Sequence, residues 1–303
     1  MVKSELIAKI KELKEKKNAV ILAHNYQIGD IQDIADFTGD SLELAKKVVG
    51  IDKDIIVFCG VRFMAEMAHM LSPEKKVLIP RIDAGCPMAD TINAEDVKEL
   101  RKKYPNHTFI AYVNTNADVK AEIDICCTSQ NALEIVKNVK NDKIVFLPDK
   151  NLGNYVKQQV PEKEIILWNG CCNVHNRIRL DEVKAAKALH PESELIVHPE
   201  CVPEVVEFAD KALSTGGMVR YVKTAEAKSF LIGTEEGMIH RLKQEAPDKE
   251  FLTVSNAFVC PNMKKTRLED VLESLEKEKF EITLDKETRE KGKQTLDEML
   301  KYL

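Results

Sequence analysis

The 303-residue sequence has no long apolar run. A membrane-spanning helix needs about 20 consecutive apolar residues, and no run approaches that length, so we expect no membrane partner. The N-terminal residues 1–17 have the pattern of a charged amphipathic helix and not that of a signal peptide. These absences favour a cytoplasmic chain, whose cysteine thiols stay reduced.

The sequence also lacks the glycine-rich loops that bind nucleotides. Neither GxGxxG nor GxxxxGK[ST] occurs, which argues against a dinucleotide or nucleoside triphosphate site. An excess of positive charge is absent too, since the formal net charge is -5. A dedicated nucleic-acid binder is usually basic, so we expect no nucleic-acid partner.

The CxxC spacing is missing as well, although the chain has eight cysteines, and Cys86, Cys172 and Cys260 are widely separated. Structural zinc sites usually use pairs such as CxxC, and four-thiolate iron–sulfur sites commonly show short-range pairs too. In a reducing compartment, eight cysteines favour metal binding or catalysis over a disulfide framework. Any metal site must therefore collect cysteines from distant segments.

A strand-rich pattern occurs three times along the chain. The two main strand segments of each repeat end 35 residues apart: Asn25 to Gly60, Asn114 to Asp149, and Glu200 to Glu235. A third apolar segment follows each pair and ends at Pro80, Trp168 or Val254. Such self-similarity at a fixed period is the signature of a repeat architecture.

Helical patterns fill the gaps between these segments. Strands that alternate with helices predict parallel βαβ units whose sheets are covered on both faces. We therefore predict an α/β protein built from three similar small three-layer α/β/α units with parallel sheets, related by pseudo-threefold symmetry around a central active site. The predicted units span residues 1–88, 89–175 and 176–262, and two C-terminal helices within 263–303 are expected to pack onto the first unit.

Chemically active side chains follow the first strand of each unit. Ligands of open α/β sheets bind beyond the carboxyl ends of the strands. Imidazoles, phenols and carboxylates can transfer protons near neutral pH when burial tunes them. Each of these residues could instead make an ordinary loop hydrogen bond, but their equivalent positions favour a shared site. They are His24, Asn25, Tyr26, Tyr112, Asn114, His198 and Glu200.

Hydroxyl residues follow about 15 residues later, at the expected start of a helix in each unit. They are Ser41, Ser129 and the pair Ser214 and Thr215. Such hydroxyls cap free backbone N–H groups. Converging helix N-termini would also suit carboxylates or phosphate, and both roles are compatible.

One cysteine comes four to six residues after the third segment of each unit: Cys86, Cys172 and Cys260. A triplicated fold can bring these three thiols to one point. The spacing suits a [4Fe–4S] cluster in which one iron has no protein thiolate and acts as a Lewis acid in dehydration. A zinc site and unrelated buried thiols remain alternatives at this point.

Other residues near these cysteines are ambiguous. Cys171 competes with Cys172, because spacing barely distinguishes them. His175 either orients a ligand, contacts substrate or serves only its loop. Cys201 could face the cavity, although packing is the simpler role, and Cys126 and Cys127 have no equivalents in the other units.

Taken together, these residues resemble the quinolinate synthase A family, the iron–sulfur enzymes of de novo NAD biosynthesis. In that family the second cluster cysteine lies in a segment like Gly-His-Cys-Pro-Val-His. The register makes Cys172 the ligand here and puts Cys171 where histidine is usual. The similar segments run in order over nearly the whole chain: AHNYQ (23–27), QDIADFTGDSLELAKK (32–47), GCPMAD (85–90), YVNT (112–115), TSQNA (128–132), HPEC (198–201), STGGM (214–218), GTEEGMIHRL (233–242) and CPNMKK (260–265).

The resemblance implies a reaction and a cofactor. Iminoaspartate would condense with dihydroxyacetone phosphate to give quinolinate, with loss of phosphate and two waters. Cys86, Cys172 and Cys260 would hold a [4Fe–4S] cluster with one open iron, and that iron would bind substrate and promote dehydration. An aspartate-oxidising enzyme would supply the imine.

The resemblance also implies residue roles. Tyr26, His198 and Glu200 would transfer protons. The substrate-binding residues would be His24, Ser41, Tyr112, Asn114, Ser129, His175, His198, Glu200, Ser214 and Thr215. Two alternative functions are another hydro-lyase with an open-iron cluster and a non-catalytic, zinc-stabilised metabolite-binding protein.

Overall fold

The computed structural model describes residues 2–302 and contains three four-stranded parallel sheets. The strand order is the same in each: β2-β1-β3-β4, β6-β5-β7-β8 and β10-β9-β11-β12. The strands are β1 (Ala19–His24), β2 (Phe37–Gly39), β3 (Ile55–Cys59), β4 (Lys76–Leu78), β5 (Thr108–Tyr112), β6 (Ile125–Cys127), β7 (Lys143–Leu147), β8 (Glu164–Leu167), β9 (Glu194–Val197), β10 (Lys211–Ala212), β11 (Ser229–Gly233) and β12 (Glu250–Thr253).

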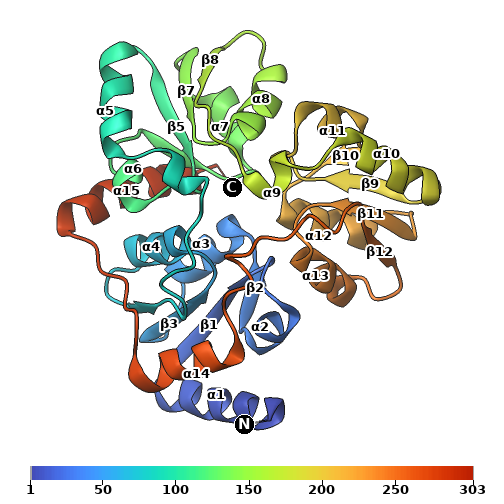
Figure 1. Ribbon diagram of the computed structural model, residues 1–303. Coiled ribbons are helices and arrows are strands. Elements are labelled where there is room, and N and C mark those ends of the chain that lie inside the picture. Colours follow the sequence, from blue (N-terminus) through green and yellow to red (C-terminus); the bar gives the residue numbers. More distant parts are fainter. Residues whose placement is uncertain (1, 303) are drawn as a thin grey trace.

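Helices connect the strands and cover the sheets, and the three sheets surround a common centre (Figure 1). The predicted α/β class with three similar units is confirmed. The helices are α1 (Lys3–Lys16), α2 (Gly29–Ile34), α3 (Ser41–Val49), α4 (Arg62–Leu71), α5 (Ala94–Lys103), α6 (Ala117–Lys120), α7 (Ala132–Asn138), α8 (Lys150–Gln158), α9 (Asn173–Asn176), α10 (Leu180–Leu189), α11 (Pro203–Phe208), α12 (Thr215–Thr224), α13 (Gly237–Glu245), α14 (Leu268–Lys277) and α15 (Lys286–Leu300).

Each sheet has one strand that the sequence pattern did not reveal. The edge strands β2, β6 and β10 are only two or three residues long. A segment of that length shows no measurable alternation of apolar and polar residues, so its pairing depends on the neighbouring strand. The other nine strands lie in apolar segments that were predicted from their β-branched runs.

The strand β1 shows why helices must cover both faces of a sheet. Val20 and Leu22 belong to an apolar cluster with residues of α3 and α4, whereas Ile21 and Ala23 belong to a second cluster with residues of α1 and α14. Successive strand residues point to opposite faces, so a strand that is apolar throughout must lie between two layers. Full burial of a leucine or isoleucine contributes roughly 1.5–3 kcal/mol.

The two C-terminal helices pack differently from each other. α14 contacts α1 and β3 of the first unit. α15 contacts α4 of that unit but also β6 and α6 of the second, whereas the sequence assigned both helices to the first unit. Gly292 of α15 permits this close approach, because a Cβ atom there would lie 2.6 Å from Cε of Met70. The C-terminal segment therefore joins two units.

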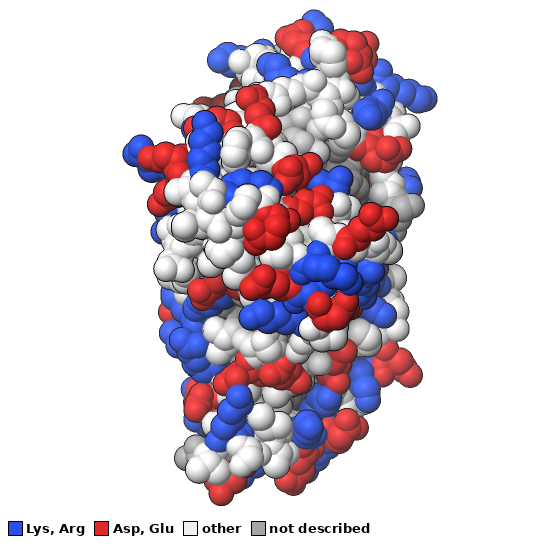
Figure 2. Space-filling view, turned by 90° about the vertical axis from the view of Figure 1, so that its right-hand side faces the viewer, with Lys and Arg blue, Asp and Glu red and all other residues white. Residues whose placement is uncertain are grey.

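The surface carries mixed charge. Lysine and arginine side chains alternate with aspartate and glutamate side chains over the face shown in Figure 2. Within residues 2–302, none of the helices combines the length and the apolar character that crossing a bilayer requires.

Candidate active site

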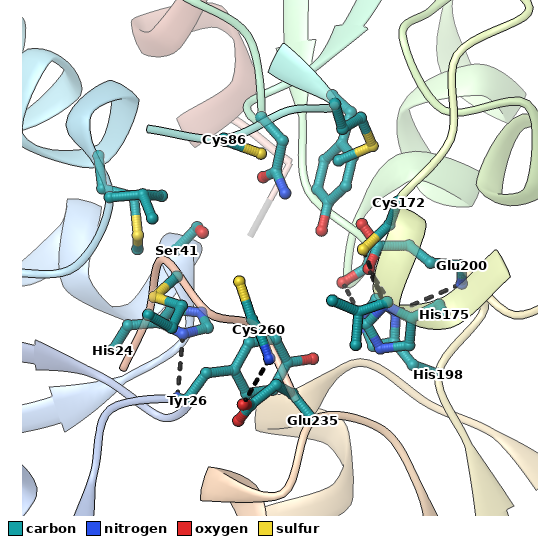
Figure 3. A pocket seen from close by; sticks show the side chains of 18 of the residues that line it. His24, Tyr26, Ser41, Cys86, Cys172, His175, His198, Glu200, Glu235 and Cys260 are labelled. Atoms are coloured by element: carbon teal, nitrogen blue, oxygen red, sulfur yellow. Dashed lines mark hydrogen bonds and ion pairs between the residues drawn. The ribbon is translucent and has the colours of Figure 1, made fainter. Parts of the chain in front are cut away.

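The carboxyl ends of the strands of all three sheets face one central cavity. Tyr26, Tyr112 and His198 follow or end the first main strand of their units, and all three line this cavity. Figure 3 shows side chains from the three units pointing into the same space. The predicted site residues that line it are His24, Tyr26, Ser41, Cys86, Tyr112, Asn114, Ser129, Cys172, His175, His198, Glu200, Thr215 and Cys260.

Three equivalent loops carry Cys86, Cys172 and Cys260 to the cavity, and their sulfurs point toward a common space (Figure 3). In each unit, a residue at the start of the helix that follows the second main strand donates its backbone N–H. The acceptor is the carbonyl two residues before the cysteine. Each of these bonds is 2.8 Å long. The pairs are Arg62 to Ala84, Lys150 to Gly170, and Glu236 to Phe258.

Backbone N–H groups of the turn that follows each cysteine oppose the effect of burial on the pKa of its thiol. They are those of Met88 and Ala89 for Cys86, of His175 for Cys172, and of Asn262 and Met263 for Cys260. Burial raises the pKa of the Cys86 thiol to about 12, and it also raises the pKa of Cys172 and Cys260.

Such a set of thiols fits an iron–sulfur cluster. Bound metal displaces the thiol proton that burial otherwise retains, and thiolates are the ligands that these clusters use. The backbone N–H groups are placed to stabilise negative sulfur. Three sulfur donors that face one cavity can therefore supply the thiolate ligands of such a cluster.

The remaining cysteines lie elsewhere. Cys171 is partly exposed, and it is not among the residues that line the cavity. Cys59, Cys126, Cys127 and Cys201 are buried, and they do not line it either. The geometry therefore favours Cys172 over its neighbour as the second thiol of the site.

A carboxylate between two imidazoles forms one wall of the cavity. Oε2 of Glu200 lies 2.9 Å from Nδ1 of His175 and 3.2 Å from Nδ1 of His198. Burial opposes ionisation of Glu200, but the adjacent His198 and His175 together hold its pKa below the usual range of a glutamate. Burial lowers the pKa of His198. Glu200 is therefore a carboxylate that imidazole N–H groups can stabilise.

The same cluster can hold a metal ion or orient a thiolate. One donor atom each from Cys172, His175 and Glu200 lies within 4.8 Å of the others. Nδ1 of His175 is also 3.2 Å from Sγ of Cys172. The helix α9 brings the imidazole and the sulfur together, because Cys172 is its N-cap and His175 lies three residues later on the same face.

A hydrogen-bonded chain joins Glu200 to Tyr26. Nε2 of His175 lies 2.8 Å from the hydroxyl of Thr234, which lies 2.7 Å from the Tyr26 hydroxyl. Burial and the charge of Glu200 raise the pKa of Tyr26 well above that of a free phenol. Tyr26 thus keeps its proton and can act as an acid.

Two further neutral groups face the cavity. Burial lowers the pKa of His24 to about 3, so its imidazole is uncharged near neutral pH. Burial, together with the charge of Glu200, raises the pKa of Tyr112 far above its ordinary value. These residues can position a ligand through hydrogen bonds without adding charge.

Among the described residues, two buried acceptors on side chains that line the cavity lack a hydrogen-bond partner. They are Oδ1 of Asn114 and Oε1 of Glu200, and both side chains line the cavity. A buried acceptor without a partner costs about 1–3 kcal/mol. A ligand that offers N–H or O–H groups would satisfy both.

The hydroxyl residues occupy less uniform positions than the sequence suggested. Ser41 and Thr215 are the first residues of α3 and α12. Ser129 instead precedes α7, which begins at Ala132, and its hydroxyl lies 3.1 Å from Nε2 of His198. Ser214 does not line the cavity, because its hydroxyl accepts the N–H of Gly217 as the N-cap of α12.

Several residues of the site escaped the sequence analysis. Asp40 caps α3 and accepts the N–H of Gly216 from the third unit. Thr234, Asp149 and Glu235 follow the second main strands, where the strand register alone could have drawn attention to them. Their partners lie in other segments, so no local residue pattern predicts the contacts.

Comparisons with known proteins show the family to which the chain belongs. The profile of the family described as quinolinate synthetase A protein matches residues 8–301. The chain belongs to the quinolinate synthetase A family. It is therefore an enzyme, and membership of this family implies an iron–sulfur cluster.

Three relatives named quinolinate synthase are identical to the chain at about half of the aligned positions. Quinolinate synthase of Caldicellulosiruptor saccharolyticus is 53% identical over 292 residues, which are 96% of each chain. Quinolinate synthase of Alkaliphilus metalliredigens is 50% identical over 301 residues, or 99% of each chain. Quinolinate synthase of Methanosarcina barkeri is 49% identical over 300 residues, covering 99% of this chain and 98% of the relative.

Proposed function

We propose that this chain is a quinolinate synthase that condenses iminoaspartate with dihydroxyacetone phosphate. The products are quinolinate, one phosphate and two waters, which account for all atoms of the two substrates. The observation that carries the proposal is the meeting of three cysteines from equivalent loops with Glu200 and its two histidines at one cavity.

Cys86, Cys172 and Cys260 would hold a [4Fe–4S] cluster. Three thiolates leave one of the four irons without a protein ligand, and when bound this group supplies Lewis acidity for removing a substrate hydroxyl. Cys171 is assigned no ligand role, because it does not line the cavity.

Both substrates are small anions, and the helix starts suit them. Ser41 and Thr215 offer hydroxyls at the positive ends of α3 and α12. Ser129 adds a third hydroxyl from the second unit. Ser214 supports this arrangement indirectly, by capping α12. We assign these groups to the carboxylates and the phosphate.

His24, Tyr112, Asn114 and His175 would orient the bound substrates. The free Oδ1 of Asn114 accepts an N–H or O–H, and the neutral imidazole and phenol add hydrogen bonds. Holding two reactants in a reactive orientation lowers the barrier of a condensation step substantially.

Glu200 is the base in this scheme, because it stays ionised and its Oε1 is free to accept a substrate proton. His198 supports the charge of Glu200 and can pass a proton through its imidazole. Tyr26 retains its phenolic proton and acts as the acid. The Thr234 and His175 contacts connect the acid to the base, so the proton can return after each turnover.

We also propose that the enzyme works in the cytoplasm and receives its imine from another enzyme. Iminoaspartate is unstable, so an enzyme that oxidises aspartate has to supply it. Cluster-bearing cysteines need a reducing compartment, which the cytoplasm provides.

Anaerobic purification followed by iron, sulfide and zinc analysis is the first test. We expect about four irons and four sulfides per chain, and quinolinate when both substrates are supplied. A colourless protein with stoichiometric zinc would overturn the cluster. A protein with a full cluster that forms no quinolinate, but dehydrates a single hydroxy acid, would establish the alternative hydro-lyase.

A further inference from the structure

Two buried carboxylates lie directly behind the cysteine loops. Oδ2 of Asp149 accepts the backbone N–H of Cys172 at 2.9 Å, and Oε1 of Glu235 accepts the backbone N–H of Cys260 at 3.0 Å. Both side chains are almost completely buried, with relative exposures of 0% and 1%. Neither is among the residues to which the proposed reaction gives a role.

The two carboxylates share one pair of contacts in their units, although Glu235 also pairs with Lys264 and lines the cavity, whereas Asp149 does not line it. Each follows the second main strand and uses its other oxygen for the start of the next helix. Oδ1 of Asp149 accepts the N–H of Leu152 in α8 at 2.8 Å. Oε2 of Glu235 accepts the N–H of Gly237 in α13 at 2.7 Å. Each carboxylate therefore bridges a helix start and a cysteine amide.

The first unit lacks this bridge. The equivalent position is Gly60, which has no side chain to accept the N–H of Cys86, and the Cys86 loop keeps the backbone bond from Arg62 to Ala84 that all three units share. The shared bond is therefore enough to form a cysteine loop. Burying a carboxylate is costly unless it gains strong partners, so two added carboxylates point to a task beyond forming the loop.

Their contacts indicate that task. A cysteine N–H that binds a carboxylate cannot turn toward sulfur. Hydrogen bonds to the sulfurs, together with net charge, set the reduction potential of iron–sulfur clusters. Around Cys172 and Cys260, backbone N–H groups of the following turn act on the pKa of the thiol, while the cysteine's own N–H is held by a carboxylate.

We infer that Asp149 and Glu235 are positioning residues that fix the amides of Cys172 and Cys260 away from sulfur and thereby keep the reduction potential of the cluster low. The inference rests on the proposed function, since it requires the cluster. A low potential favours the oxidised cluster, whose greater positive charge suits Lewis-acid chemistry.

The test uses the anaerobically prepared full-length protein with Asp149→Asn and Glu235→Gln. Each amide keeps the size of the side chain but offers one acceptor oxygen for two N–H groups. We expect both variants to bind iron and sulfide, with midpoint potentials more positive than wild type and altered spectra of the reduced cluster. Asp149→Glu supplies the residue type that the third unit uses, and we expect it to restore the wild-type potential.

Glu66→Gln is the matched control. Glu66 is a buried carboxylate that accepts the N–H of Ala117 at 3.0 Å and an N–H of Arg62, but it does not line the central cavity. This change should leave the potential unchanged. A shift as large as that of Asp149→Asn would overturn the inference, because any buried carboxylate would then have the same effect.

The remaining outcomes are also decisive. Unchanged potentials and spectra in cluster-loaded Asp149→Asn and Glu235→Gln would refute the inference while leaving the proposed function intact. Loss of the cluster from Asp149→Asn but not from Asp149→Glu would support the same positioning role. Suppose that both Asp149→Asn and Asp149→Glu lose the cluster, and that only the apoprotein of Asp149→Asn has a wild-type melting curve. This result would refute the positioning role. A wild-type protein without any cluster would refute the proposed function and this inference together.

Discussion

The Nδ1 atom of His175 lies 2.9 Å from Oε2 of Glu200, and the two residues come from different units. His175 lies on α9 of the second unit, and Glu200 follows β9 of the third. The contact therefore exists only when the two units pack together. It also leaves Oε1 of Glu200 free to face a ligand.

Glu200→Gln should abolish most of the activity without removing the cluster. The amide cannot accept a proton, and general acid–base catalysis typically contributes about 10²–10⁴-fold to a rate. Steady-state quinolinate formation measures the loss, and cluster absorbance checks retention. Glu236→Gln is the control and should keep wild-type activity, because the Glu236 side chain is half-exposed and does not line the cavity. Equal activity of Glu200→Gln and wild type would refute the assigned role.

Single Cys→Ala changes test the thiol assignment. Replacement of Cys86, Cys172 or Cys260 removes a sulfur that faces the cavity, so we expect loss of the cluster. Cys171→Ala should retain it, because Cys171 does not line the cavity. Iron and sulfide analysis after anaerobic reconstitution measures the outcome. Retention in Cys172→Ala with loss in Cys171→Ala would show that the register is wrong by one residue.

Gly237→Ala should displace the Tyr26 loop. An added Cβ would lie 2.8 Å from the carbonyl carbon and oxygen of Tyr26 and 2.9 Å from the carbonyl oxygen of Gln27. Backbone atoms cannot yield easily, and overpacking of this kind costs roughly 1–3 kcal/mol. We expect a lower melting temperature and a lower kcat. Gly50→Ala is the control, because nothing lies within 4 Å of its Cβ, and unchanged kcat in Gly237→Ala would contradict the expectation.

His24 should make the apoprotein less stable as the pH falls. Burial lowers its folded-state pKa to about 3, whereas an unfolded histidine titrates near pH ~6.5. Between these values the unfolded chain binds a proton that the folded chain does not, so stability is fully present above pH ~6.5 and declines below it, by at most about 1.4 kcal/mol per pH unit. The charge of Glu200 opposes this lowering, and His198 and Lys264 add to it.

Melting temperatures of the apoprotein between pH 7 and pH 5 measure the effect. The comparison is with His24→Gln, which cannot take up this proton. Buried groups that do not interact with His24 titrate alike in both proteins, so the difference between the two slopes reports His24 together with its charged neighbours Glu200, His198 and Lys264. We expect a shallower slope for His24→Gln, and identical slopes would contradict the assignment.

The residue pattern was sufficient to predict the repeat and much of the site. β-branched runs predicted nine strands, because a strand buried on both faces must be apolar along its length. The carboxyl ends of those strands then pointed to His24, Tyr112 and His198 as cavity residues, and the cysteine spacing pointed to Cys86, Cys172 and Cys260. These inferences depend only on local order along the chain.

Contacts between residues far apart along the chain were decided by the tertiary structure alone. The partners of Thr234 are Tyr26 and His175, which are 208 and 59 residues away along the chain. Asp149 and Glu235 reach cysteine amides 23 and 25 residues away. Nothing in the residue types at these positions distinguishes such a bridge from an ordinary helix cap.

The sequence by itself determined three units, a cysteine after the third strand of each, and the chemical groups at the strand ends, because periodicity and strand polarity are local properties. The tertiary structure decided that Ser214 caps a helix instead of facing the cavity, that Ser129 precedes its helix, and that α15 joins two units. These outcomes depend on how helices and loops pack across unit boundaries, where side-chain size and hydrogen-bond geometry select one arrangement from several compatible with the same local pattern.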